Sequence, residues 1–306
     1  MSAFRSSLLL LACLPLVAQA PGDWQWSLPK GFPKPLVPAS NPMTVAKVEL
    51  GRYLFYDTRM SVNGTQSCAS CHKQELAFTD GRPVAIGATG QKHPRGAMSL
   101  VNVAYSKVLT WSDPTMTQLE QQALVPMFGE HPVELGLRKG YAFVPMLHSD
   151  STYQPLFAKA FPNEPDPFTV DNVVKAIACF ERSIISAKSP FDRYHYGGDE
   201  SAISAAAKRG EIVFFSQPFT CFTCHGGPTF SDNQVPKVPT LRNIALTGPY
   251  LHDGSVVSLE DTFEHNANGA YHLSAARRKD LVEFLKSLTD ESVLHDPRFA
   301  NPWLSR

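Results

Sequence analysis

The stretch SCASCHKQELAFTD, residues 67–80, contains two cysteines three positions apart, with a histidine directly after the second. The same arrangement returns as CFTCH at residues 221–225. A CxxC pair by itself fits a redox-active pair, part of a zinc site, or the covalent attachment of a haem. The rest of the chain decides between these alternatives, and with them the fold.

The repetition of the complete motif favours haem attachment. Two thiols at this spacing can add to the two vinyl groups of one haem, and the adjacent histidine then faces the iron. A shared zinc ion would draw its ligands from opposite halves of the chain, and neither zinc nor two disulfides would explain a histidine after each pair. A thioredoxin-like pair follows a strand, a pattern that is absent here. We therefore predict two c-type haems, attached through Cys68, Cys71, Cys221 and Cys224, with His72 and His225 as axial iron ligands.

The composition narrows the class of protein further. The chain has 28 basic and 28 acidic residues, so nothing indicates an electrostatic nucleic-acid binder. Charged residues are only 18%, and 25 prolines predict long loops. Apolar residues recur at helical spacing, while alternating strand patterns are almost absent. We predict a mainly α fold made of two cytochrome c-like haem domains with long loops.

The apolar pattern also divides the chain. We predict a signal peptide at 1–20, a Pro-rich extended arm at 21–42, an N-terminal haem domain at 43–190 and a C-terminal haem domain at 191–306. The expected helices cover 43–57, 117–128 with a break at Pro126, 169–186 with Asp171 as N-cap, 202–215, 258–266 and 274–289. The segment SPFDRYHYGG, 189–198, is expected to be a hinge between the halves.

The N-terminus has the pattern of an export signal. Residues 1–20 combine Arg5, a short apolar run and small residues near the end, and the run is too short for a membrane span. Cleavage after Ala18-Gln19-Ala20 is the favoured interpretation. The alternative is a lipobox ending at Cys13, which would leave a lipid-anchored protein. Either way we expect a periplasmic location.

Several longer motifs resemble a known family, the bacterial di-haem cytochrome c peroxidases, including the MauG-type enzymes. They are ELGRYLFYDTRMSVNGTQSCASCH at 49–72, SPFDRYHYGG at 189–198 and VPTLRNIALTGPYLHDGSVVSLED at 238–261. The similarity extends over residues 41–290. Within the family, HPRGAMSLVNVAY at 93–105 and LVPMFGEHPVELGL at 124–137 are most similar to MbnH-like enzymes.

The resemblance implies that the haem on His72 is the peroxide site. Its distal pocket holds a glutamate from a PVELG motif, here Glu134, whose carboxyl suits the proton transfers that peroxide cleavage needs. Gln122 and Pro126 match a pair that lines the same pocket. Trp111 stands where the family has a tryptophan between the haems, which relays oxidising equivalents.

Two further ligand sets are implied by the same family. A bridging calcium ion would be held by Asn102, Thr247 and Pro249, because amide and carbonyl oxygens suit a hard cation. His93 lies in the loop that supplies a resting-state iron ligand in some relatives, but its offset from His72 is longer than expected. We therefore expect an open or water-bound first haem.

The distal ligand of the second haem is where the sequence departs from the family. Relatives supply Met or Tyr at the position that falls here on Asn266, a poor iron ligand. His265 and Tyr271 are the candidates to replace it, with His272 behind them. The last methionine is Met146, which argues against the usual electron-accepting peroxidase.

Two other positions qualify the comparison. His252, in PYLHDG, is a family motif residue expected to be structural. Phe219 replaces a surface tryptophan that MauG uses for electron hopping, so the exit route to a protein substrate must differ.

The leading hypothesis is an exported di-haem oxidoreductase that uses hydrogen peroxide to form a high-valent di-haem state. It would oxidise a residue, expected to be tryptophan converted to kynurenine, on an MbnP-like copper-binding partner. One alternative is a periplasmic cytochrome c peroxidase that takes electrons from a small cytochrome or cupredoxin. The other is an electron-transfer cytochrome without peroxide chemistry, which Glu134 argues against.

Overall fold

The computed structural model describes residues 22–111, 113–138, 143–217, 219–231, 237–263 and 273–304. Over these ranges the chain is mainly helical, and paired extended residues are limited to four isolated bridges, which confirms the predicted class. The expected signal peptide and Cys13 lie outside the described residues. No helix among the described residues has the length and apolarity to cross a bilayer.

Two helices cross at the centre of the N-terminal half, α1 (Val45–Tyr56) and α7 (Val170–Ser183). They approach so closely at Gly51 that a Cβ there would lie 2.0 Å from the carbonyl oxygen of Ala176. The Phe180 side chain, one turn further along α7, lies against the same glycine. Only glycine permits this approach of the two backbones.

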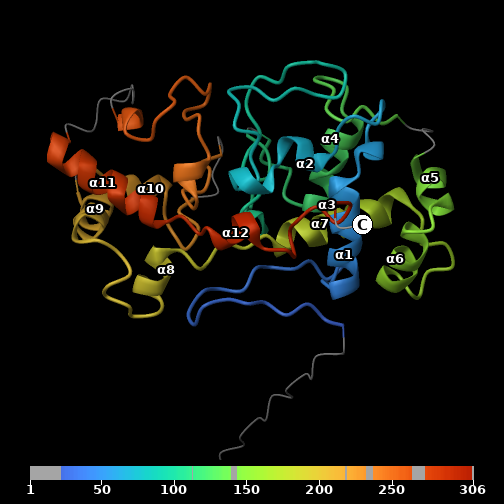
Figure 1. Ribbon diagram of the computed structural model, residues 1–306, viewed down its shortest axis with the longest axis horizontal. Helices are drawn as coiled ribbons and strands as arrows, with labels where there is room; N and C mark the ends of the chain where they lie inside the picture. Colours follow the sequence, from blue (N-terminus) through green and yellow to red (C-terminus); the bar gives the residue numbers. More distant parts are fainter. Residues whose placement is uncertain are drawn as a thin grey trace, which may run out of the picture.

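The C-terminal half repeats the arrangement with α9 (Ala205–Phe215) and α11 (Ala275–Ser287). A Cβ on Gly210 would lie 2.0 Å from the carbonyl oxygen of Asp280, and Phe284 takes the place of Phe180. Figure 1 shows this pair at one end of the molecule and the α1–α7 pair toward the other. The two crossings explain why glycine is followed four residues later by phenylalanine in both GRYLF and GEIVF.

The remaining helices of the described chain are short and are separated by long loops. They are α2 (Cys68–Cys71), α3 (Leu119–Gln122), α4 (Leu124–Phe128), α5 (Phe143–Ser149), α6 (Tyr153–Ala160), α8 (Pro190–His195), α10 (Cys221–Cys224) and α12 (Ser292–His295). Five single 3₁₀ turns join them: η1 (Thr58–Met60), η2 (Gln74–Leu76), η3 (Val103–Tyr105), η4 (Ile244–Leu246) and η5 (Asp261–Phe263). Each CxxC motif forms its own one-turn helix, α2 or α10.

Some expected boundaries were wrong. The helix over 117–128 breaks at Ala123, between α3 and α4, and Pro126 lies inside α4, where the first turn of a helix needs no amide donor. The N-cap of α7 is Thr169, whose hydroxyl accepts from the Asn172 amide, and Asp171 lies in the first turn. Of the expected helix over 258–266, the described part forms only η5.

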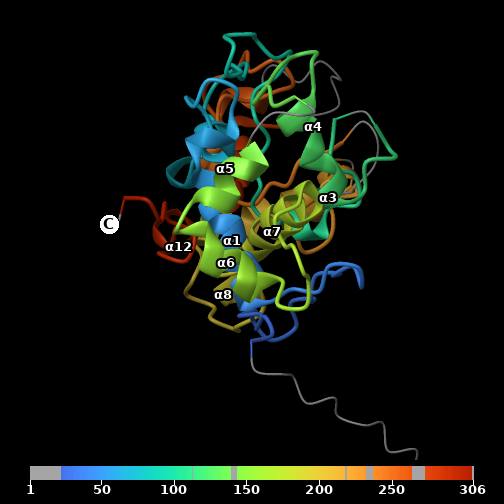
Figure 2. The same ribbon diagram turned by 90° about the vertical axis from the view of Figure 1, so that its right-hand side faces the viewer.

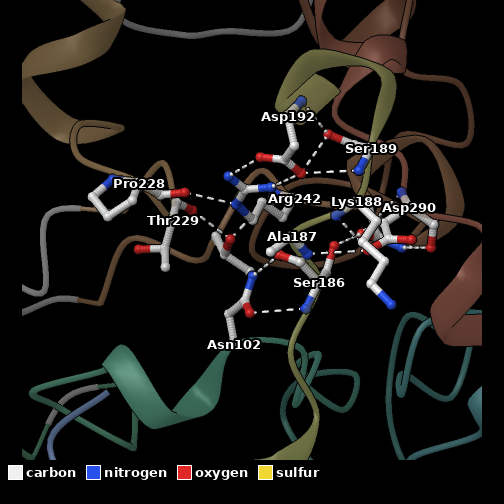
Figure 3. Close-up of polar contacts among 12 residues, drawn as sticks. Asn102, Ser186, Ala187, Lys188, Ser189, Asp192, Pro228, Thr229, Arg242 and Asp290 are labelled. Atoms are coloured by element: carbon white, nitrogen blue, oxygen red, sulfur yellow. Dashed lines mark hydrogen bonds and ion pairs between the residues drawn. The ribbon is translucent and has the colours of Figure 1, made fainter. Parts of the chain in front are cut away.

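The expected hinge at 189–198 is a fixed junction. Ser189 and Asp192 form a capping box that starts α8. The Asp192 carboxylate also receives two hydrogen bonds from Arg242, and both side chains are buried. Arg242 Nε also donates to the Pro228 carbonyl oxygen (Figure 3), so the residue that holds Asp192 is itself fixed within the C-terminal half.

The two halves meet at Ser186. Its amide donates to Asn102 Oδ1 and its carbonyl accepts from Asn102 Nδ2, as Figure 3 shows, while its hydroxyl donates to Asn243 Oδ1. Both asparagines have left-handed backbones, with φ of 60° and 62°, and precede matching 3₁₀ turns, η3 and η4. The carboxylate of Asp290 accepts from the next two amides, those of Ala187 and Lys188. Each half therefore contributes one asparagine to a shared hydrogen-bond network.

Both ends of the described chain pack against residues that lie far from them in the sequence. Phe32 of the arm packs edge-on against Tyr105 and Tyr196, and the Arg242 guanidinium carbon lies 5.0 Å from its ring centroid. At the other end the chain continues beyond α11 and α12, as Figure 1 shows. The Trp303 ring packs edge-on against that of Tyr53 in α1, and Figure 2 gives a second view of these helices. The proposed domain limits stay predictions, and the terminal segments contact elements beyond their own half.

Candidate functional site

The first CxxCH motif borders a cavity of about 250 Å³. Cys68, Cys71 and His72 line one part of it, and Gln122, Pro126 and Glu134 line another. The structure therefore brings together the first attachment motif and the three residues expected in the distal pocket. The volume is far larger than the ~30 Å³ that one water molecule occupies in the liquid, and suits a cofactor edge or a small substrate.

The second motif borders a larger cavity of about 710 Å³. Cys221, Cys224 and His225 line it, together with His252 and residues from η4, α9 and α11. Phe219 is buried, and the Arg277 guanidinium carbon lies 5.7 Å from its ring centroid. Phe219 is therefore no counterpart of a surface relay residue.

Each histidine is oriented by a backbone carbonyl. His72 Nδ1 lies 3.0 Å from the Phe78 carbonyl oxygen, and His225 Nδ1 lies 3.3 Å from that of Phe230. A proton on Nδ1 in this bond leaves the lone pair on Nε2, the nitrogen that would face an iron. Both phenylalanines have positive φ, 60° and 53°, an uncommon conformation for a large residue that recurs at the same place in each half.

Three of the four motif cysteines have thiols whose pKa is raised by burial. Burial raises the pKa of Cys68 and Cys221, and it raises that of Cys71 to about 11. Reactive thiolates need the opposite shift. Of the described residues, no group of three or more His, Cys, Asp or Glu side chains is placed to hold a metal ion. These features fit thioether formation better than the alternatives.

Trp111 lies in the wall between the two cavities. The residues that line both cavities are Arg95, Gly96, Ala97, Met98, Ser99, Trp111 and Lys237. The Arg95 guanidinium carbon lies 4.7 Å from the Trp111 ring centroid, and the Trp111 carbonyl accepts from the Lys237 amide. Sequence reasoning did not identify Arg95 or Lys237, because both lie in loops without periodic pattern.

Glu134 is held by backbone bonds on both sides. Its carbonyl accepts from the Ala88 amide at 2.6 Å, and the next residue, Leu135, donates to the Pro126 carbonyl. Burial raises the pKa of the Glu134 carboxyl to about 7, so the group can both take and give a proton near neutral pH. His93 Nε2 lies 3.7 Å from Glu134 Oε1 and lines the same cavity.

The expected calcium ligands border the same cavity. Asn102, Thr247 and Pro249 all line the larger cavity. The Asn102 amide is held by Ser186, as described above, and the Thr247 hydroxyl lies 3.3 Å from the Ile244 carbonyl. The calcium site stays a prediction.

The candidates for the distal ligand of the second haem, His265, Tyr271 and His272, lie outside the described residues, as does Asn266. Sequence reasoning also missed Glu181 of α7. Its side chain is buried against the first cavity, and Oε2 has no hydrogen-bond partner among the described residues. The apolar pattern of α7 hid it, because a helical face with one carboxyl still has helical periodicity.

Comparison with known proteins agrees with this geometry. The model of the family described as di-haem cytochrome c peroxidase matches residues 45–201. The MauG protein of Methylophilus methylotrophus is 32% identical, with 93% of this chain and 95% of that protein covered. The chain belongs to the di-haem cytochrome c peroxidase family.

The other relatives include both cytochrome c peroxidases and MauG-like proteins. The cytochrome c551 peroxidase of Pseudomonas aeruginosa is 30% identical, covering 97% of this chain and 94% of that protein. A crystal structure of a MauG-like protein associated with microbial copper homeostasis superposes with a TM-score of 0.86 at 36% identity. That match covers 92% of this chain and 99% of the other. The chain is a di-haem peroxidase-type oxidoreductase, as predicted.

Membership in this family implies two c-type haems, and the residues present fit them. Each CxxC thiol pair lies on one face of a single helical turn, at the edge of a cavity. Each following histidine is oriented through Nδ1. When bound, the haems supply the oxidation–reduction chemistry, while this chain's side chains orient substrate and move protons.

Proposed function

We propose that this enzyme uses hydrogen peroxide to oxidise a tryptophan, to kynurenine, on a copper-binding partner protein. Peroxide is handled in the cavity beside His72, with Glu134 as the acid–base group. Gln122 and Pro126 shape the pocket around it. Trp111 passes oxidising equivalents to the second cavity, from which they reach the partner.

The observation that carries the proposal is the close match to the MauG-like protein of copper homeostasis, which covers 99% of that chain. The position of Trp111 supports it, because a side chain in the wall between two cavities divides one long electron transfer into two shorter ones. The sequence contains no methionine after Met146, so the C-terminal half supplies no thioether ligand. A harder ligand such as His265 or Tyr271 would stabilise oxidised iron.

The test mixes the haem-loaded protein, hydrogen peroxide and an MbnP-like copper-binding protein, and follows that protein by mass spectrometry. We expect oxygen to be added to one partner tryptophan. The variant Glu134→Gln is the control and should leave the partner unmodified. An unmodified partner, together with rapid peroxide turnover by reduced cytochrome c, would contradict the proposal.

That contrary result defines the second candidate function, a cytochrome c peroxidase that takes electrons from a small cytochrome or cupredoxin. The 30% identity to a cytochrome c551 peroxidase over 97% of this chain favours it. Reduced cytochrome c consumed in proportion to peroxide is its signature. Both functions fit export to the periplasm, which we propose from the pattern of residues 1–20.

We further propose that Asn102, Thr247 and Pro249 hold a calcium ion through amide and carbonyl oxygens, which suit this cation. Elemental analysis of the purified protein should find about one calcium per chain. Loss of that calcium in Asn102→Ala, with both haems retained, would assign the site. Calcium that is absent from wild type would contradict it.

A further inference from the structure

His93 and Glu134 face each other in the first cavity. The 3.7 Å between His93 Nε2 and Glu134 Oε1 is just longer than a hydrogen bond, and a small rotation of either side chain would close it. His93 Nε2 is buried, and no other side chain or carbonyl among the described residues bonds to it. Among the described residues, Glu134 is the carboxylate that lies within 4 Å of this nitrogen, and Asp80 also acts on His93 electrostatically.

The backbone fixes His93 in this position. Its amide donates to the Ala85 carbonyl at 2.9 Å, and the Ala85 amide donates to the Arg95 carbonyl. Between them Ile86 and Lys92 form a β-bridge. His93 therefore belongs to a hydrogen-bonded hairpin rather than to a loop that swings away.

The same hairpin holds the segment that carries Glu134. The Ala88 amide donates to the Glu134 carbonyl, and Gln91 Oε1 accepts from the Val133 amide at 2.8 Å. Gly87 makes this contact possible, because a Cβ there would lie 1.8 Å from the Val133 carbonyl oxygen. These contacts hold the backbone of the His93 hairpin against the segment that carries Glu134.

We propose that His93 is the second member of an acid–base pair with Glu134, and is not a ligand of the iron. The inference rests on the peroxide chemistry of the proposed function. The pair would take one proton from one oxygen of hydrogen peroxide and return one to the other oxygen. The O–O bonding electrons would leave with that second oxygen as water, and the haems, when bound, would supply the two electrons that the remaining oxygen needs.

The charges around the pair are consistent with this role. Burial raises the pKa of Glu134 to about 7 and lowers that of His93, so both shifts favour the uncharged form of the group. The negative charge of Asp80 acts in the opposite direction on the pKa of His93, because it favours the protonated imidazole. The other ionisable side chains that line the cavity, besides the haem-attachment residues, are Arg95, Glu181 and Lys237.

The test compares haem-loaded wild type with His93→Gln, Glu134→Gln, the double variant and the loop control Lys92→Gln. Ferric EPR reports whether His93 binds iron, and stopped-flow mixing measures the rate of reaction with peroxide from about pH 5 to about pH 9. We expect Glu134→Gln to lose roughly 10²–10⁴-fold in rate. His93→Gln should lose roughly 10-fold or more and shift the pH midpoint, with an unchanged EPR spectrum.

The double variant should be no slower than Glu134→Gln alone, since the two groups act as one unit. Conversion of a low-spin to a high-spin signal in His93→Gln would make His93 a ligand and overturn the inference. If His93→Gln reacted with peroxide at the wild-type rate and with the wild-type pH profile, that result would also overturn the inference. If His93→Gln does not load haem, His93→Asn serves the same comparison. Wild type that reacts with peroxide but leaves the partner unmodified would sink only the partner hypothesis, whereas no peroxide reaction would remove both.

Discussion

The Arg242 guanidinium and the Asp192 carboxylate form two hydrogen bonds, of 2.8 and 2.9 Å, with side chains 0% and 1% exposed. The pair joins α8 to the loop that precedes η4, beneath the network centred on Ser186. Removal of one partner leaves the other charge buried without compensation, which costs about 3–5 kcal/mol.

We therefore expect Arg242→Met to lower the free energy of unfolding of the haem-loaded protein by about 3–5 kcal/mol, as measured by denaturant titration. The matched control is Arg209→Met. Arg209 pairs with Asp280 at the surface, where its side chain is 59% exposed and solvent screens the charges, so its loss should cost far less than that of Arg242. Equal losses in the two variants would show that the buried pair has no special role.

The two helix crossings depend on Gly51 and Gly210. An added methyl group would overlap a backbone carbonyl in both cases, and backbone moves less readily than side chains. We expect Gly51→Ala and Gly210→Ala each to destabilise by about 1–3 kcal/mol or more. Gly64→Ala, with φ of +70° but no neighbour within 4 Å, measures the cost of backbone strain alone and should be smaller.

The sequence predicted those elements whose signals are local. The CxxCH motifs and the long helices α1, α7, α9 and α11 were found, because spacing and periodicity identify them. The Ser186 network was missed: Asn102 was expected only as a calcium ligand and Asn243 was not singled out, because the residues that bond to Ser186 lie far from it along the chain. His93 was considered, and not favoured, as a resting-state iron ligand. Its approach to Glu134 could not be predicted, because the two residues lie far apart along the chain and only the folded loop brings them together.

The sequence alone also did not identify which residue caps a helix, and the N-terminus of α7 provides a test. Asp171 has the right residue type for an N-cap, but the hydroxyl of Thr169 makes the capping bond. We expect Thr169→Ala to cost about 1 kcal/mol in thermal or denaturant unfolding. Asp171→Ala removes only an exposed first-turn charge and an i,i+4 pair with Lys175, so about 0.5 kcal/mol is expected. The reverse order would restore Asp171 as the cap.

Glu181 predicts an unusual dependence of stability on pH. Burial raises the pKa of its carboxyl to about 8, whereas an unfolded glutamate titrates near ~4.3. Between these values the folded protein keeps a proton that the unfolded chain has lost, so the free energy of unfolding falls as pH rises through this window. Glu181→Gln should reduce the fall between about pH 5 and about pH 8 by roughly 1–3 kcal/mol. An identical pH profile in wild type and variant would contradict a protonated Glu181.

Trp111 gives the most direct test of communication between the two cavities. If its indole relays oxidising equivalents, Trp111→Phe should leave the first reaction with peroxide within about 2-fold of wild type, because Glu134 and His93 are untouched. The rate at which oxidised partner appears should instead fall by about 10-fold or more. Trp303→Phe is the control, since Trp303 lines neither cavity. Trp111→Phe with wild-type yields of oxidised partner would mean that electrons cross the wall by another route.

The Arg95 guanidinium over the Trp111 ring makes removal of an electron from the indole harder. Arg95→Gln should therefore lengthen the lifetime of a tryptophan radical detected by rapid-freeze EPR after peroxide is added.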